Sequence, residues 1–180
     1  MIFEPFPMFL PSEYRVKFAT EAWEKREAVK LRRQVFCDEQ GIFAGDDRDA
    51  IDDIAIPIVA ISSLGVAPED VVGTVRIHEA EPGVWWGSRL AVAASYRRIG
   101  AIGSSLVRLA VSSAHARGCT KFLAHVQSQN APLFQRLHWS TIAEVEFHGR
   151  PHHFMQADLD HYPPFADAET GFLSLPKKAA

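Results

Sequence analysis

The sequence has little cysteine and no long apolar run. Its 180 residues include two cysteines, Cys37 and Cys119, without a CxxC pair. We therefore expect reduced thiols, as in the cytoplasm, and neither a disulfide framework nor a cysteine metal site. No apolar stretch approaches the ~18 residues that a membrane span needs. The N-terminal residues are interrupted by Pro5 and Pro7, and no Lys or Arg precedes Arg15, which is a poor pattern for a secretory signal.

An excess of positive charge is also missing. The net charge is −3 and the pI is about 6.2, so the sequence lacks the basic footprint of a nucleic-acid-binding protein. There is no internal repeat. Because 47% of the residues are hydrophobic and 11% aromatic, the chain can bury a full core without a metal or disulfides, and a single main domain is expected.

Two common nucleotide-binding motifs are absent. A P-loop needs GxxxxGK[ST], and the chain contains no Gly-Lys pair. The dinucleotide-binding pattern GxGxxG is missing too, because the only glycines in the relevant turn are Gly100 and Gly103. Any nucleotide-like cofactor must therefore be held by another arrangement.

The most informative stretch runs from Leu90 to Gly118. Leu90-Ala91-Val92 predicts the end of a strand, a basic turn follows, and apolar residues at helical spacing continue to Gly118, which is suited to end a helix. A helix N-terminus presents unpaired N–H groups and partial positive charge. The stretch therefore predicts an anion site suited to pyrophosphate. Arg97 and Arg98 would add positive charge, Gly100 and Gly103 would let the ligand approach the backbone closely, and Ser104 would add a hydroxyl.

This stretch resembles the acetyl-CoA loop of the GNAT family of N-acetyltransferases, (Gln/Arg)-x-x-(Gly/Ala)-x-(Gly/Ala). The preferred match is Arg98-Ile99-Gly100-Ala101-Ile102-Gly103, because a register that starts at Arg97 would put Ile102 where a small residue is expected. Other phrases similar to the family follow in the family's order: LRRQVFCDEQ at 31–40, GTVR at 73–76, LFQRLHW at 133–139 and HGRPHHFM at 148–155. Within the family, the sequence is most similar to a bacterial branch found beside nitrilase-type genes under nitrogen limitation.

The resemblance implies an α+β fold with α/β/α layers. Its centre would be a mixed, mostly antiparallel sheet, splayed into a V, with helices on both faces. We expect an N-terminal arm at 1–13, the acetyltransferase domain at 14–160 and a loosely packed tail at 161–180. The apolar side chains of the arm hint at a homodimer. Periodicity predicts strands at 14–19, 54–61, 71–78, 84–92, 121–126, 139–147 and 151–159, and helices at 20–36, up to Gly118 and at 131–137.

The implied reaction is transfer of an acetyl group from acetyl-CoA to a primary amine, expected to be a small molecule, without a metal. The loop from Arg98 to Ser104 would hold the pyrophosphate. The backbone of Leu90, Ala91 and Val92 would pair with the pantetheine arm, and the Val92 N–H would polarise the thioester carbonyl. Asn130, or else Gln127, would also bond the pantetheine.

The proton chemistry is where the sequence departs from the family. Phe134 occupies the position of a tyrosine that protonates the leaving thiolate in many relatives, and it has no proton to give. His125 is the leading candidate for the base, with Glu79, Glu81 and His78 as competitors. A non-catalytic acyl-CoA-binding regulatory module with the same fold is the alternative that Phe134 favours.

Several further residues have open roles. Of Trp85 and Trp86, one is expected in the core and the other in the wall of a substrate pocket. The acidic loop 45–53 is expected to be solvated, or else to attract a cationic amine. His148, His152 and His153 are expected to line the acceptor side or to be exposed, because their spacing does not suit a metal.

Overall fold

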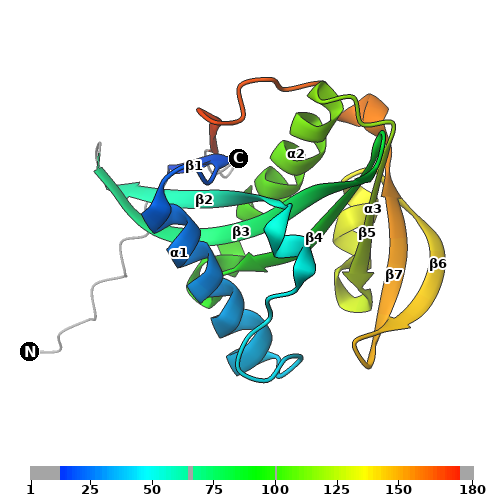
Figure 1. Cartoon of the computed structure of the whole chain (residues 1–180), viewed down its shortest axis with the longest axis horizontal. Helices are drawn as coiled ribbons and strands as arrows, with labels where there is room; N and C mark the ends of the chain where they lie inside the picture. Colours follow the sequence, from blue (N-terminus) through cyan, green and yellow to red (C-terminus); the bar gives the residue numbers. More distant parts are fainter. Residues whose placement is uncertain (1–12, 65–66, 100, 175–180) are drawn as a thin grey trace, which may run out of the picture.

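The computed structural model describes residues 13–64, 67–99 and 101–174, which fold around a mixed eight-stranded sheet with the order β6-β7-β5-β4-β3-β2-β1-β8 (Figure 1). The strands are β1 (Tyr14–Phe18), β2 (Ile56–Leu64), β3 (Ala67–Glu81), β4 (Val84–Val92), β5 (Lys121–Gln127), β6 (Trp139–Phe147), β7 (Arg150–Ala157) and β8 (Phe172–Ser174). The α-helices are α1 (Ala22–Arg32), α2 (Ala101–Ala116) and α3 (Ala131–Arg136). Of these, none has the length and apolar character that crossing a bilayer requires.

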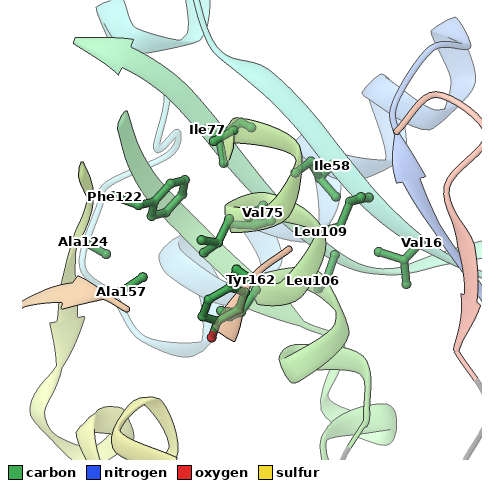
Figure 2. Close-up of a cluster of buried hydrophobic side chains, with 14 of the residues drawn as sticks. Val16, Ile58, Val75, Ile77, Leu106, Leu109, Phe122, Ala124, Ala157 and Tyr162 are labelled. Carbon is green, nitrogen blue, oxygen red and sulfur yellow. The ribbon is translucent and has the colours of Figure 1, made fainter. Parts of the chain in front are cut away.

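The sheet carries α1 on one face and α2 on the other (Figure 1). Side chains alternate along a strand, so Ile58 and Ala60 of β2 pack with α2, whereas Val59 and Ile61 pack with Ala28 of α1. The α2 face holds the larger core, where Leu106 meets side chains from several strands (Figure 2). This layering confirms the α+β fold expected from the resemblance.

The V-shaped opening lies between β4 and β5. These parallel neighbours pair only from Val84–Trp86 to Lys121–Leu123, although β4 continues to Val92 and β5 to Gln127. The register of β4 against β3 shifts between Thr74 and Arg76. Opposite that shift Arg89 has a φ of 57°, which marks a bulge, and bulges bend the strand that carries them. From Gly87 onward the edge of β4 that faces β5 is therefore unpaired with it.

The N-terminal helix differs in detail from its sequence prediction. We expected one helix at 20–36, but the cap residue is Glu21 and α1 ends at Arg32. Glu24 accepts from the Glu21 N–H at 2.8 Å and so completes a capping box. The chain then continues as a π-helical segment, η1 (Arg33–Glu39). Such segments are frequent at functional sites, and η1 lies beside the cavity described below.

The tail is not loose where the structure describes it, which corrects the expectation for residues 161–180. β8 pairs with β1, and the side chain of Tyr162 is buried. The Tyr162 hydroxyl accepts from Trp139 Nε1 at 3.1 Å and donates to the Leu137 carbonyl. Gly171 has a φ of 71°, and an added Cβ would meet the Val16 carbonyl oxygen at 1.8 Å, so only glycine fits this close approach. The arm at 1–12 lies outside the described residues.

Candidate active site

A cavity of about 440 Å³ lies at the splay between β4 and β5. Its lining comes from both faces of the sheet: Val107 and Phe122 belong to the α2 side, and Trp86 and His125 to the α1 side. A cavity with walls on both faces passes through the sheet. It can therefore bring a cofactor and an acceptor together from opposite sides, which is the arrangement that a transfer reaction needs.

The open edge of β4 offers backbone groups to this cavity. The Ala93 N–H donates to the Val72 carbonyl of β3 at 2.8 Å. Because successive residues of a strand point their backbone groups to opposite edges, Val92 faces the open side. Its carbonyl accepts from Arg97 Nε at 2.9 Å. Leu90 lines the cavity, whereas the Ala91 side chain is buried against η1.

The N-terminal turn of α2 is adjacent to the end of β4. The predicted tight loop is a 3-10 helix, η3 (Ala94–Ile99), and α2 begins at Ala101. Gly100 lies outside the described residues. Ile102 is buried in the core, so its side chain is a packing residue. An added Cβ at Gly103 would meet no atom within 4 Å, which leaves room for a pyrophosphate against the helix N-terminus.

The polar side chains of the loop have different surroundings. Ser104 Oγ donates to the Ala101 carbonyl at 3.2 Å. Arg97 pairs with Glu39 at 2.6 Å, so it ties the loop to the end of η1. Arg98 is exposed. Arg97 is exposed as well, but its guanidinium is engaged by Glu39 and by the Val92 carbonyl.

Aromatic rings form the acceptor wall on the α1 face. Trp86 stacks on Phe154 at 5.6 Å, and His125 lies 5.2 Å from Trp86 and 4.6 Å from Phe147. Trp85 is buried on the opposite face in the main core. The expected division between a core tryptophan and a pocket tryptophan is therefore confirmed.

His152 is the histidine whose importance the sequence does not reveal. It is only 5% exposed and lines the cavity. Its Nδ1 is 2.9 Å from the Arg150 carbonyl, and a carbonyl only accepts, so Nδ1 is the nitrogen that carries the proton in the neutral ring, and Nε2 then has the lone pair. Neither Nε2 of His152 nor either ring nitrogen of His125 has a hydrogen-bond partner among the described residues.

Three histidines of the cavity, His125, His148 and His78, have lowered pKa values, which favours their neutral forms. Burial lowers the pKa of His125 below the ordinary 6.5, and His152 and His148 lower it further. Burial, followed by the charges of Arg89 and His152, lowers the pKa of His148. Burial and Arg76 lower the pKa of His78, which also lines the cavity. A neutral imidazole can accept a proton at neutral pH.

The acidic loop is held to the sheet by buried ion pairs, so it is not merely solvated. Arg32 binds Asp47 at 2.8 Å and Asp52 at 2.7 Å. Arg76 binds Asp49 at 2.7 Å and Asp52 at 2.9 Å, and Arg89 joins Asp47 at 3.0 Å. We call these three arginines and three aspartates the acidic-loop ion network. Sequence patterns gave no signal for it, since its arginines come from α1, β3 and β4.

We expect Asp52→Asn to destabilise the protein by about 3 kcal/mol, because it leaves Arg32 and Arg76 buried with fewer charges to pair with. Burial alone would raise the pKa of Asp52, but hydrogen bonds led by the one from Arg32 hold that pKa well below 3.8. Hydrogen bonds from Arg76 lower the pKa of Asp49 as well. Carboxyls with depressed pKa values stabilise the fold above the unfolded value and lose that effect as the pH falls.

Urea unfolding at several pH values measures this effect. Stability should be level above about pH 5 and fall below about pH 4 in wild type, with a smaller fall in Asp52→Asn. Asp53→Asn is the matched control, because Asp53 is exposed. Equal stabilities for the two variants would contradict a structural role for the network.

The structure places most of the remaining predicted residues at the cavity and one of them away from it. Asn130, Gln127 and Phe134 line the cavity, and Gln127 donates to Gln40 Oε1 at 3.0 Å. Phe134 is 6% exposed and packs edge-on against Trp139. Glu79 is not brought to the cavity: its carboxylate accepts from the Gly83 N–H at 2.8 Å in the β3–β4 turn. Among the described residues, no group of His, Cys, Asp or Glu is arranged to hold a metal ion.

Comparison with known proteins agrees with this geometry. The sequence model of the acetyltransferase (GNAT) family matches residues 18–139. The chain belongs to the GNAT family. GNAT proteins are acetyl-CoA-dependent acyltransferases, and this chain is a GNAT-type N-acyltransferase with the fold described above. A search of the curated proteins found no match.

Solved structures share the GNAT fold at low sequence identity. A Lactobacillus plantarum protein, described provisionally as an N-acetyltransferase, is 22% identical with a TM-score of 0.70, over 80% of this chain and 97% of that one. Escherichia coli ElaA is 18% identical with a TM-score of 0.66, over 81% and 98%. An acyl-CoA N-acyltransferase from Pseudomonas aeruginosa is 14% identical with a TM-score of 0.61, over 81% and 99%.

Proposed function

We propose that this GNAT protein transfers an acetyl group from acetyl-CoA to the primary amine of a small molecule. The observation that carries the proposal is the cavity through the splayed sheet, with the open edge of β4 beside it and the N-terminus of α2 next to it. A structure 14% identical to this chain, with a TM-score of 0.62, is a spermidine N-acetyltransferase chimera from Vibrio cholerae and hSSAT. That likeness supports a small-molecule amine acceptor within this fold.

The cofactor side consists mainly of backbone. Acetyl-CoA supplies the thioester carbonyl that the amine attacks. The first turn of α2, from Ala101 to Ser104, would hold the pyrophosphate together with Arg98. Val92 would donate its N–H to the carbonyl oxygen, where negative charge develops in the transition state. Residues at these positions need the right backbone more than a particular side chain.

The acceptor side supplies the base. His125 is our proposed base: it lines the cavity, it is held between Trp86 and Phe147, and its pKa is lowered. It would take the proton that the amine nitrogen loses as the C–N bond forms and the C–S bond breaks. His152 offers a second proton acceptor at Nε2 in the same cavity.

The described lining of the cavity offers no tyrosine that could protonate the leaving thiolate, and Phe134 cannot donate. A thiol has a pKa of about 8.5, so the thiolate can leave unprotonated and take its proton from water. This absence is also what favours the alternative, an acyl-CoA-binding regulatory module without catalysis.

Calorimetric titration with acetyl-CoA, CoA and dephospho-CoA tests the cofactor assignment. We expect binding of acetyl-CoA and CoA at micromolar concentrations, about −8 kcal/mol. If none of the three releases heat or shifts the melting temperature, the assignment of residues 98–104 fails. Given binding, turnover of any member of a panel of primary amines establishes the enzyme, and binding without turnover establishes the regulatory module.

A further inference from the structure

The bulge in β4 adds an arginine to the acceptor face. In a regular strand, Trp86 and Ser88 would face α1 and Arg89 would face α2. The left-handed φ of 57° at Arg89 breaks this alternation, and its guanidinium lies 4.4 Å from the ring centroid of Phe43 on the α1 side. Left-handed backbone is unfavourable for a non-glycine residue, and the contacts of the Arg89 side chain offset that cost. Strained residues of this kind cluster at functional sites.

One nitrogen of the Arg89 guanidinium, Nη1, is available to a ligand. Its Nε donates to Asp47 Oδ2 at 3.0 Å, and its Nη2 donates to the Asp47 carbonyl at 3.0 Å and to Asp49 Oδ2 at 3.3 Å. Nη1 has no hydrogen-bond partner among the described residues. It is also not one of the fully buried polar atoms, so it is accessible from the cavity that Arg89 lines. The side chain as a whole is 9% exposed. A largely desolvated guanidinium with free N–H groups is a strong binder of carboxylates.

The described lining of the cavity offers no free carboxylate that could bind a second ammonium group of the acceptor, such as a polyamine carries. Asp49 is the acidic residue among its described lining. Both oxygens of Asp49 are engaged by Arg76, Oδ1 at 2.7 Å and Oδ2 at 2.9 Å. Arg76 itself lines the cavity with its side chain 3% exposed. Asp49 therefore has no oxygen left for an ammonium group, which disfavours polyamines, whereas the unpaired Nη1 of Arg89 favours an acceptor that carries a carboxylate.

The aromatic residues that line the rest of the cavity favour an acceptor that contains a ring. Phe43 lies against the guanidinium of Arg89, Phe147 stacks on His125, and the Trp86 ring lies 5.2 Å from that of His125. Flat rings of this kind bind another ring by stacking or edge contacts. The proposed base, His125, lines the same cavity as Arg89.

We propose that the acceptor is an aromatic primary amine that also carries a carboxylate, and that Arg89 binds this carboxylate through Nη1. The proposal rests on the N-acyltransferase function proposed above. Arg89 is then the residue that decides acceptor specificity, and the β4 bulge is the feature that places it.

Matched amines test the proposal on the full chain with acetyl-CoA. The pairs are 4-(aminomethyl)benzoate with benzylamine, and phenylalanine with 2-phenylethylamine, so each differs only in the carboxylate. Wild type should show a kcat/KM about 10–100-fold higher for the carboxylated member, as expected for a hydrogen bond to a charged group. In Arg89→Lys that ratio should fall toward one, because lysine keeps the charge but lacks the fork. Arg108→Lys, an exposed arginine of α2, should keep the wild-type ratio.

The outcomes are distinguishable. Equal kcat/KM values within both pairs in wild type overturn the carboxylate proposal while leaving the N-acyltransferase intact, and so does a clear preference for spermidine. An unchanged ratio in Arg89→Lys also overturns it. Binding of acetyl-CoA with no turnover of any amine overturns the proposed function instead. Melting temperature and acetyl-CoA affinity of each variant are measured alongside, so that a loss of fold is recognised directly.

Discussion

Gly103→Trp should abolish CoA binding and leave the fold intact. The space beside Gly103 is open, with no atom within 4 Å of an added Cβ, so an indole group would fill the volume that we assign to the pyrophosphate without a clash inside the protein. It would also cover N–H groups of the first turn of α2, which are the anion donors of the site. We expect a loss of affinity of at least about 100-fold, or about 2.7 kcal/mol, measured by calorimetry.

The matched control is Gly103→Ala. A methyl group fits the open space, and alanine favours a helix over glycine by about 0.5–1 kcal/mol. This variant should therefore retain CoA binding and melt at a slightly higher temperature. If Gly103→Trp folds and binds CoA with wild-type affinity, the pyrophosphate does not lie at this helix terminus.

Replacement of the proposed base should produce the largest loss of turnover. We expect His125→Gln to lower kcat/KM by about 10²–10⁴-fold, the usual contribution of general acid–base catalysis, with little change in CoA affinity. Glutamine preserves much of the side-chain volume but cannot accept a proton near neutral pH. His153→Gln is the control, because His153 bonds Thr141 and Glu144 instead of lining the cavity.

The pH profile gives this role a second readout. A base must be neutral, so kcat/KM should fall on the acid side of the base's pKa. That pKa is lowered from 6.5, so the acid limb should appear below pH 6.5 and disappear in His125→Gln. If His152→Gln loses the limb and the greater part of the activity while His125→Gln keeps both, the base is His152 of β7.

Local patterns determined much of this fold. The prediction of β6 at 139–147 is confirmed to the residue, and α2 ends before Gly118, whose φ of 91° is the conformation expected after a helix. Such elements depend on side-chain periodicity and on backbone preferences within a few residues. The identity of Phe134 likewise settled at once that this position offers no proton.

Tertiary structure alone decided the chemistry of the acceptor side. Arg89 reaches the cavity because a bulge reverses the side-chain alternation, and nothing in the alternating pattern signals that reversal. In His152 the Arg150 carbonyl decides which ring nitrogen carries the proton of the neutral form, and the side chain is buried where β7 packs between other strands. The acidic loop is held to the sheet by arginines far away in sequence. Periodicity reports which face of one element is apolar, whereas ion pairs, tautomers and cavities depend on which elements meet.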